Sequence, residues 1–494
     1  MSDSVNIPEE GIAKDDILEA MRGYREGDAD WKAGRTWSLV YYAGEEHYDL
    51  LKEAYTMFMS ANGLNPMAFK SLKRMEAEVV RMTAGMLHGD EEVVGTMTSG
   101  GTESILMAVK AARERAGFLQ KWPMRPEIVA PRTIHPAFSK AAHYFGAKMR
   151  YVELDEDYRV DVDALEKAIG PRTMLVAASA PQYPHGMVDP IEEIAQITRK
   201  KGVPFHVDAC FGGFMLPWVE KLGYDVPVFD FRIDGVTSMS ADVHKYGYAA
   251  KGASVVLYRD MSYLKHQFFV ETEFPGGIYA SPTMAGTRPG GAIAAAWAAM
   301  RSLGEDGYME LAKGAMDAKG ELVEGIEALD ALEILGSKHA TVVCFRSKDP
   351  GVDTYALADQ LQERGWAFDR QQKPASLHCT VNAHNASVIG EFLADLEEAV
   401  EHVRAHPELS SEGDAAMYGM MAKIPVRSAV KMSVRKVMEE MYGKNAAEPD
   451  LGSITGDEDS DWMLQLVGRY GDRVLDVLDE VDNVRKRVTR MILG

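Results

Sequence analysis

A lysine between two β-like runs is the first residue whose position suggests chemistry. Lys245 lies in the segment Ser240 to Tyr248, after the run Gly235 to Met239 and before the apolar run Ser254 to Tyr258. We therefore expect it in a loop between two strands. A lysine whose pKa is lowered by burial or by a nearby positive charge forms an imine readily with an aldehyde. A His-Lys pair taken alone favours an ordinary surface lysine.

An aspartate at the end of another strand changes that balance. The run Pro204 to Val207 is apolar and is followed by Asp208 and then by small residues. A carboxylate beside a pyridine nitrogen keeps the nitrogen protonated, so the ring can accept electrons from a breaking bond. An imine-forming lysine together with such an acid indicates pyridoxal 5′-phosphate. Two alternatives stay open for Asp208, a helix N-cap and a satisfied polar group. His206 and Asp208 would be half a metal site, but no Cys or His spacing completes it, so no metal is predicted.

A glycine-containing loop supplies the third element. Thr98 to Ser104 follows the apolar run Val93 to Met97 and precedes the helical pattern Ile105 to Ala112. Glycines let the backbone approach an anion, and the N-terminus of the next helix offers N–H groups, so Gly101 and Thr102 are candidates for binding a phosphate. Simple N-capping by Thr102 is the alternative.

A histidine lies just past a further strand end. His135 follows the run that ends at Ala130. An imidazole there can stack on a cofactor ring or move protons near neutral pH, and a buried structural histidine is the competing interpretation.

These residues require a scaffold that brings strand ends together. Short β-rich runs alternate with helical patterns in the middle of the chain, at Ile128 to Ala130, Met149 to Leu154, Met174 to Ala178, Pro204 to Val207, Gly235 to Met239 and Ser254 to Tyr258. This alternation predicts an α/β fold with a mainly parallel sheet covered by helices, whose ligands gather at the carboxyl ends of the strands. We divide the chain into an N-terminal arm (1–58), a large cofactor-binding domain (59–303), a smaller C-terminal α/β domain (304–406) and a helical tail (407–494).

Composition excludes several classes of function. The chain has 494 residues, 46% of them hydrophobic, and a formal charge of −21, which argues against general nucleic-acid binding. Its three cysteines do not suggest a disulfide framework and fit a reducing compartment. The acidic start has no apolar signal region, and no apolar run is long enough to span a bilayer. We therefore expect a cytoplasmic protein without an integral membrane segment.

The tail has a pattern of its own. Apolar residues recur every three or four positions, at Val467, Tyr470, Val474, Val477, Val481, Val484, Val488 and Met491. This predicts a helix with one apolar face, which suits a subunit contact and packing on its own domain equally well. The acidic stretch 456–461 before it is interpreted as a solvated linker rather than a metal loop.

The ordered motifs carry a family resemblance. The glycine loop, His135, Asp208 and Lys245 together resemble the aspartate-aminotransferase-like pyridoxal phosphate superfamily, in its decarboxylase and lyase branch. More narrowly, the chain is similar to the sphingosine-1-phosphate lyase family from about Val40 to about Met421. The segments that carry this likeness are Met75 to Thr83, Thr98 to Ser104, Ala180 to Gly186, His244 to Gly252 and Gly276 to Pro282.

The resemblance implies a role for each candidate. Lys245 would form the Schiff base, Asp208 would pair with the pyridine nitrogen and His135 would stack on the ring. Groups that would hold the cofactor phosphate are Gly101, Thr102, His244 and Ser281, with Ser281 reaching in from the second subunit of a homodimer with shared active sites. Tyr41 and Lys251 would recognise the substrate phosphate, and Tyr279 is a candidate catalytic hydroxyl. The implied reaction cleaves the C2–C3 bond of a phosphorylated sphingoid base to a long-chain aldehyde and phosphoethanolamine.

Two departures from the family pattern concern the substrate. Asn65 stands where the family has a histidine near the substrate phosphate, and a neutral amide cannot carry positive charge. Ala250 stands where proline usually precedes Lys251. An amino-acid decarboxylase of the same superfamily, which shares the lysine, aspartate and histidine, is the alternative function. It would need a carboxylate clamp, for which Arg288 is a candidate. A non-catalytic scaffold that binds partners through the tail is a further alternative.

Overall fold

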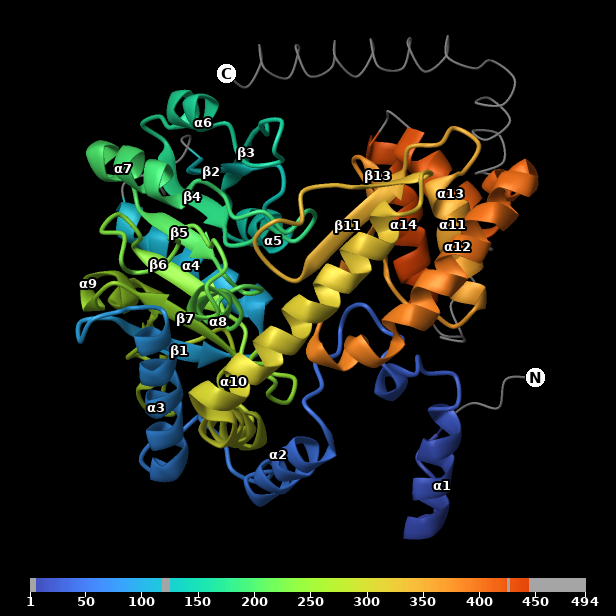
Figure 1. Ribbon diagram of the computed structural model, residues 1–494. Helices are drawn as coiled ribbons and strands as arrows, with labels where there is room; N and C mark the ends of the chain where they lie inside the picture. The colour runs from blue at the N-terminus through green and yellow to red at the C-terminus, as the bar shows by residue number, and fades with distance from the viewer. Residues whose placement is uncertain (1–5, 118–124, 424–426, 444–494) are drawn as a thin grey trace.

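The main structural feature is a seven-stranded sheet. The computed structural model describes residues 6–117, 125–423 and 427–443 of the chain (Figure 1). The sheet has the order β1-β7-β6-β5-β4-β2-β3. Its strands are β1 (Val94–Thr98), β2 (Glu127–Pro131), β3 (Lys148–Val152), β4 (Thr173–Ser179), β5 (Phe205–Asp208), β6 (Ser238–Ala241) and β7 (Ser254–Tyr258). Only the pairings that β7 makes with β1 and β6 are antiparallel. The predicted mainly parallel sheet is confirmed.

One strand begins later than its sequence pattern predicts. The run Gly235 to Met239 starts as a turn, because the N–H of Val236 donates to the carbonyl of Ile233 at 3.1 Å. A Cβ on Gly235 would lie 2.6 Å from the carbonyl oxygen of Ala195, so this glycine permits close backbone packing rather than strand pairing. Pairing with β5 starts at Ser238.

Helices surround the sheet (Figure 1). They are α3 (Lys70–Met86), α4 (Gly101–Ala116), α5 (Ala137–Tyr144), α6 (Val162–Ala168), α7 (Ile191–Lys201), α8 (Leu216–Lys221) and α9 (Met261–Leu264). Most of α4 is buried, because apolar residues fill the run Ile105 to Val109 on all sides, and the helix packs on β1, β4, β6 and β7. A helix that is apolar all round belongs in a core. The N-terminus of α4 is thereby fixed at the end of β1.

A second, antiparallel sheet lies apart from the first. Its order is β10-β11-β13-β12, with β10 (Leu332–Ile334), β11 (Val342–Ser347), β12 (Asp369–Gln372) and β13 (Ala375–Thr380). The accompanying helices are α11 (Thr354–Glu363), α12 (Ile389–Ala405), α13 (Gly413–Lys423) and α14 (Arg427–Met441). The long α10 (Gly290–Glu327) bridges the two sheets in Figure 1. Its helical geometry is interrupted at Gly304 (φ 58°, ψ −172°), next to the predicted boundary at residue 303.

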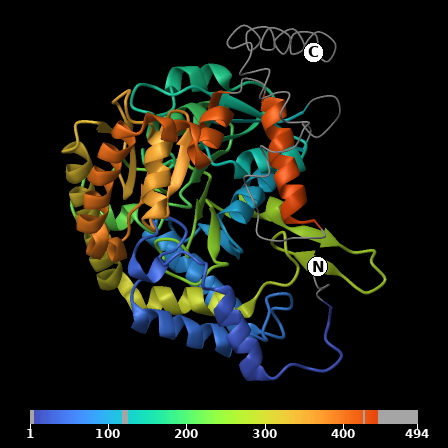
Figure 2. The same cartoon turned by 90° about the vertical axis from the view of Figure 1, so that its right-hand side faces the viewer.

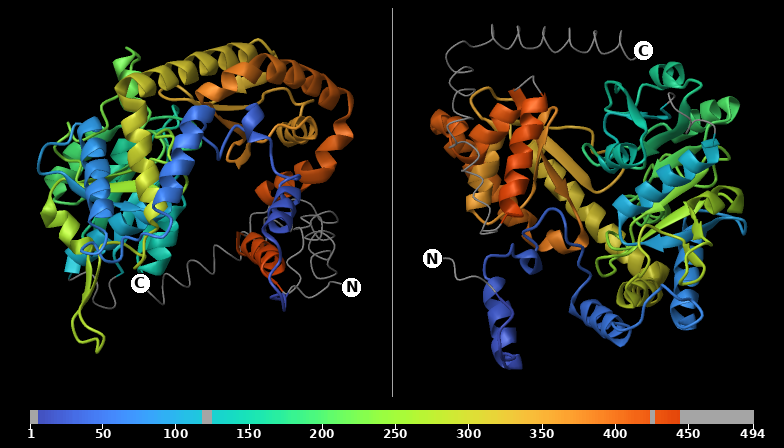
Figure 3. Two further views of the ribbon diagram at one scale, coloured as in Figure 1. Left: turned by 90° about the horizontal axis from the view of Figure 1, so that it is seen from below. Right: turned by 180° about the vertical axis from the view of Figure 1, so that it is seen from behind.

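Two segments project from the body. The helix α1 (Lys14–Tyr24) buries none of its side chains, whereas α2 (Glu45–Met57) packs on α10. The hairpin of β8 (Phe269–Glu271) and β9 (Tyr279–Ser281) extends outward in Figures 2 and 3. Short 3-10 helices lie at Trp31–Ala33, Lys265–Gln267, Ala383–Val388 and Pro407–Ser411.

Two further expectations concern membrane spans and the C-terminal tail. In the three ranges that the structure describes, no helix combines the length and apolarity that crossing a membrane requires. The apolar repeat from Val467 to Met491 and the acidic stretch 456–461 lie outside those ranges, so the interpretation of the tail stays a prediction.

Candidate active site

The predicted cofactor residues line one cavity. Asp208 is the last residue of β5, His135 follows β2, and Lys245 lies in the loop between β6 and β7. The cavity has a volume of about 400 Å³. Six of the predicted residues line it, namely Gly101, Thr102, His135, Asp208, His244 and Lys245. The parallel strands bring these side chains together because their carboxyl ends meet at one edge of the sheet.

Lys245 is held by an aspartate that sequence reasoning did not single out. Its Nζ lies 2.9 Å from Oδ2 of Asp242, whose side chain is 2% exposed. Burial works to lower the pKa of Lys245, but the negative charge of Asp242 outweighs it and raises the pKa above its ordinary value. The expected lowering of this pKa is therefore not found. The signal was available in the sequence, since Asp242 precedes Lys245 by three residues in the same loop.

Asp208 is buried in a polar setting. Its Oδ1 accepts the N–H of Cys210 at 3.1 Å and lies 3.4 Å from Oγ of Ser240. Behind it, the two ring nitrogens of His206 lie 2.9 Å and 3.2 Å from the hydroxyls of Ser238 and Ser240. Burial lowers the pKa of His206 to about 4, so this ring is neutral and does not pair with the carboxylate as a cation.

The glycine loop is shaped by close approach. A Cβ on Gly101 would lie 2.7 Å from Oδ2 of Asp242 and 2.8 Å from Sγ of Cys210, so no larger residue fits there without displacement. Glu103 fixes the loop, because one carboxylate oxygen accepts both the N–H and the hydroxyl of Ser99, at 2.7 Å and 2.6 Å. The N-cap of α4 is Gly100, without a side-chain cap, so the alternative of capping by Thr102 is wrong.

His244 connects this cavity to a neighbouring one. Its Nδ1 accepts the N–H of Ala253 at 3.1 Å, and its Nε2 lies 3.8 Å from Oδ2 of Asp242. Burial lowers the pKa of His244 to about 4, so it is neutral at pH 7. The second cavity, of about 440 Å³, is lined by His244, Tyr41 and Lys251 among others.

Tyr41 and Lys251 lie together in this second cavity. Nζ of Lys251 is 5.2 Å from the centre of the Tyr41 ring, which packs edge-on against Tyr246 with ring centres 4.9 Å apart. Burial and then the charge of Lys245 lower the pKa of Lys251 to about 8. At neutral pH the side chain carries a positive charge next to a phenol, which suits an anionic group.

Three predicted residues lie outside both cavities. Asn65 is exposed, and its Oδ1 accepts the N–H groups of Met67 and Ala68 at 3.0 Å and 3.3 Å. Tyr279 is 38% exposed on the hairpin strand β9. Ser281, at the end of β9, is buried, and its hydroxyl donates to the carbonyls of Thr283 and Ala285. A single chain does not bring these residues to Lys245.

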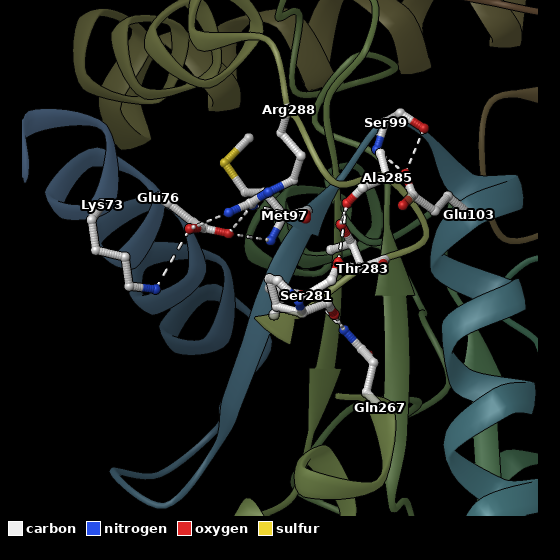
Figure 4. A network of polar contacts seen from close by, with 12 residues as sticks. Lys73, Glu76, Met97, Ser99, Glu103, Gln267, Ser281, Thr283, Ala285 and Arg288 are labelled. Atoms are coloured by element: carbon white, nitrogen blue, oxygen red, sulfur yellow. Dashed lines mark hydrogen bonds and ion pairs between the residues drawn. The ribbon is translucent and has the colours of Figure 1, made fainter. Parts of the chain in front are cut away.

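Arg288 is engaged by a buried carboxylate (Figure 4). Its guanidinium forms an ion pair with Glu76, and the two side chains are 12% and 4% exposed. Glu76 also accepts the N–H of Met97 at 3.3 Å, and Nζ of Lys73 lies 3.5 Å from it. Arg288 therefore joins the chain after the hairpin to α3 and the end of β1. It is not positioned as a free carboxylate clamp for an amino-acid substrate.

The fold and site match known proteins. Residues 30–348 match a family model described as pyridoxal-dependent decarboxylase conserved domain. The chain is 43% identical over 444 residues to sphingosine-1-phosphate lyase of Arabidopsis thaliana, covering 88% of this chain and 81% of that protein. It is 44% identical over 439 residues to sphingosine-1-phosphate lyase 1 of Rattus norvegicus, covering 88% and 77%. The chain belongs to the sphingosine-1-phosphate lyase family.

A solved structure of a bacterial lyase of this name supports that assignment. The sphingosine-1-phosphate lyase of Burkholderia pseudomallei is 38% identical, with a TM-score of 0.80, over 89% of this chain and 97% of that one. The predicted fold, the lyase class and the pyridoxal phosphate cofactor are thereby confirmed.

The cavity of this lyase-family chain fits its cofactor. Three of its features are relevant: the absence of a side chain at Gly101, the N-terminus of α4 and a lysine at the cavity wall. Such a combination suits a ligand with one phosphate and one reactive carbonyl.

Tyr183 is a further cavity residue that sequence reasoning left without a role. It lies in the loop after β4 and lines the same cavity as Asp208 and Lys245. The sequence gives no sign of its hydrogen-bond partner, because that partner belongs to the second sheet.

Proposed function

We propose that this chain cleaves the C2–C3 bond of a phosphorylated sphingoid base, such as sphingosine 1-phosphate, to a long-chain aldehyde and phosphoethanolamine. The observation that carries the proposal is the gathering of Lys245, Asp208 and the glycine loop around one cavity, in a chain of this family. The ion pair between Arg288 and Glu76 argues against the amino-acid decarboxylase alternative, because Arg288 is not free to bind a substrate carboxylate.

Each cavity residue has a task that its surroundings support. Lys245 would hold the cofactor covalently, Asp208 would face its ring nitrogen and His135 would stack on its ring. Gly101, Thr102 and His244 would surround its phosphate. When bound, pyridoxal phosphate supplies an electron sink for the breaking carbon–carbon bond.

The second cavity would hold the polar end of the substrate. Lys251 provides a cation and Tyr41 a phenol at one wall. Both properties suit a phosphate monoester. The neutral Asn65 adds an amide rather than a charge, so recognition of the phosphate would depend mainly on Lys251.

We further propose a homodimer with shared sites. Ser281 and Tyr279 would reach the partner's cofactor cavity, and Asn65 the partner's substrate. Support comes from the outward position of the hairpin and its exposed apolar side chains Phe269, Val270 and Ile278, which are 52%, 59% and 79% exposed. Exposed apolar patches of this kind mark contact surfaces.

A reducing compartment, the cytoplasm, is the proposed location. Its support is that Cys210, Cys344 and Cys379 are all free and buried. Thiols that remain unpaired fit a reducing environment.

Product analysis tests the reaction. The purified chain, supplied with pyridoxal phosphate, is incubated with sphingosine 1-phosphate and separately with a panel of amino acids. We expect long-chain aldehyde from the lipid, and an absorbance band of lysine-bound cofactor that is lost in Lys245→Ala. If an amino acid releases carbon dioxide and the lipid yields no aldehyde, the chain is a decarboxylase and not a lyase. If the chain binds no cofactor, the non-catalytic scaffold is the interpretation that remains.

Subunit mixing tests the shared site. Lys245→Ala and Tyr279→Phe chains, each of which we expect to be inactive alone, are unfolded, mixed and refolded together. If the site is shared, random pairing restores about one quarter of the parent activity, because half the dimers are mixed and each of these has one intact site. If both residues serve a site within one chain, every site carries one defect and the mixture stays inactive. The control is Lys245→Ala mixed with Asp208→Ala, which should stay inactive because both residues line the cavity of one chain.

A further inference from the structure

One hydrogen bond crosses from the cofactor cavity to the second sheet. Tyr183 lies in the loop after β4 and lines the cavity together with Asp208 and Lys245. Its hydroxyl donates to Oδ2 of Asp369 at 2.6 Å, and Asp369 is the first residue of β12. Residues 186 positions apart in the chain therefore form a phenol–carboxylate pair at the cavity wall.

The second sheet also fixes the ring of Tyr183. His378 on β13 stacks on it, with ring centres 4.1 Å apart and an interplanar angle of 28°. Nε2 of His378 lies 3.0 Å from the hydroxyl of Thr380. Next to the stack, the amide of Gln371 donates to the carbonyl of Pro184 at 2.9 Å. The ring and its loop are thus both held against the second sheet.

This arrangement decides which hydrogen-bonding capacity faces the cavity. A phenol has one proton and accepts through its oxygen lone pairs. Because the proton of Tyr183 is directed to Asp369, the phenol oxygen offers only acceptor capacity to a ligand. The proposed cleavage requires a group of this kind, since the 3-hydroxyl of the substrate must lose its proton.

Three nitrogen bases at the cavity are already engaged in the cofactor-free protein. Lys245 is paired with Asp242 and is charged at neutral pH. Nδ1 of His244 accepts the N–H of Ala253, and Nδ1 of His135 accepts the N–H of Ala137 at 3.2 Å.

We propose that Asp369 is a positioning residue that makes Tyr183 the acceptor of the substrate hydroxyl proton. This rests on the proposed lyase function. The hydroxyl proton passes to Oη of Tyr183, while the phenolic proton of Tyr183 passes to Oδ2 of Asp369. The electron pair left on the substrate oxygen forms the aldehyde C=O as C2–C3 breaks, and the pair from that bond goes to the bound cofactor. The proton on Asp369 then returns to Oη of Tyr183, and the proton that Tyr183 took from the hydroxyl goes to C2, which becomes the protonated carbon of phosphoethanolamine.

The electrostatics around Tyr183 agree with this direction of transfer. Burial, and then the charge of Asp369, raise the pKa of Tyr183 far above its ordinary value, so it does not ionise by itself at working pH. Tyr41 and Cys379 also face it and act in the same direction. Burial lowers the pKa of His378 to about 4, so the stacked ring is neutral. Within this group, Asp369 is the residue that can receive the proton.

The decisive variant is Asp369→Asn, which keeps the shape of the side chain and removes its charge. We expect kcat to fall by at least about 10²-fold, the usual contribution of a general base, with KM changed by less than about threefold. The absorbance of the lysine-bound cofactor should stay. Asp369→Glu should recover part of kcat. Tyr183→Phe should lower kcat by as much as Asp369→Asn does. The double variant should lower kcat no further than either single substitution.

Tyr355→Phe is the matched control. The hydroxyl of Tyr355 donates to the carbonyl of Gln371 on the same strand β12, at 2.5 Å, and this residue does not line the cavity. Its removal perturbs the same strand and should leave kcat within about threefold of the parent.

A spectroscopic reading separates this inference from the lyase function. With 3-fluorotyrosine at position 183, the ¹⁹F resonance of the cofactor-free protein should move in Asp369→Asn and stay in place in Tyr355→Phe. An Asp369→Asn enzyme with parent kcat would overturn the inference and leave the lyase intact. A parent chain that releases no aldehyde would overturn both, and an unmoved fluorine resonance would overturn the inference on structural grounds alone.

Discussion

Two glutamates on α3 allow a matched test of the buried network in Figure 4. Glu76 is 4% exposed at its side chain and pairs with Arg288, which is 12% exposed. Glu78 is 35% exposed and pairs with Arg74, which is 82% exposed. Both also accept an N–H, from Met97 and from the Trp297 indole respectively. The substitutions Glu76→Gln and Glu78→Gln keep volume and remove one charge each.

Burial sets the expected difference between them. Glu76→Gln leaves the Arg288 guanidinium buried without a negative partner, which costs about 3 kcal/mol of unfolding free energy, the lower end for a broken buried pair. Glu78→Gln removes an exposed pair that solvent screens, so it should leave the unfolding free energy nearly unchanged. The two variants should therefore differ by at least about 2 kcal/mol, which is a factor of about 30 in the unfolding equilibrium.

Denaturant unfolding at several pH values is the assay. Burial alone would raise the pKa of Glu76, but Arg288 outweighs it and holds the pKa below its usual value. A depressed carboxyl pKa contributes stability above the pKa of the unfolded chain, and this is lost as pH falls through the folded pKa. The gap between parent and Glu76→Gln should thus be largest near neutral pH and shrink on acidification. Equal destabilisation by both variants, or a gap that does not change with pH, would refute the reasoning.

Three further predictions concern the cavities. Gly101→Ala places a Cβ 2.7 Å from Oδ2 of Asp242, so cofactor affinity should fall by about 1–3 kcal/mol, or about 5- to 150-fold. The control is Gly85→Ala, whose Cβ would have nothing within 4 Å and which should leave the cofactor titration unchanged. Asp242→Asn removes the charge that raises the pKa of Lys245, so the pH midpoint for covalent cofactor attachment, followed by absorbance, should move down; an unmoved midpoint would contradict the pairing. Because the pKa of Lys251 is lowered to about 8, KM for the phosphorylated lipid should rise as pH increases through that value, and Lys251→Arg should keep KM flat. A parent KM that is constant from about pH 7 to pH 9 would remove Lys251 from phosphate recognition.

Local sequence determined the strand ends and the polar groups just beyond them. A run of apolar residues that stops at Asp208, or at the glycine loop, predicts a buried strand whose carboxyl end presents a polar group. Parallel strands place all such ends at one edge, so Lys245, Asp208 and His135 could be predicted to share a cavity. The apolar pattern places the start of β6 too early, because Gly235 serves close packing against α7 and a run of apolar residues does not reveal such packing.

Tertiary structure alone decided the partners of these residues. Asp369 meets Tyr183, and Glu76 meets Arg288, across 186 and 212 positions of sequence. The sign of the pKa shift of Lys245 depended on Asp242 being 2.9 Å away, although the spacing of three residues was visible from the start. Sequence order states which chemical groups exist, whereas burial and distance set their charges, because Coulomb energies and desolvation depend on where the folded chain places each group.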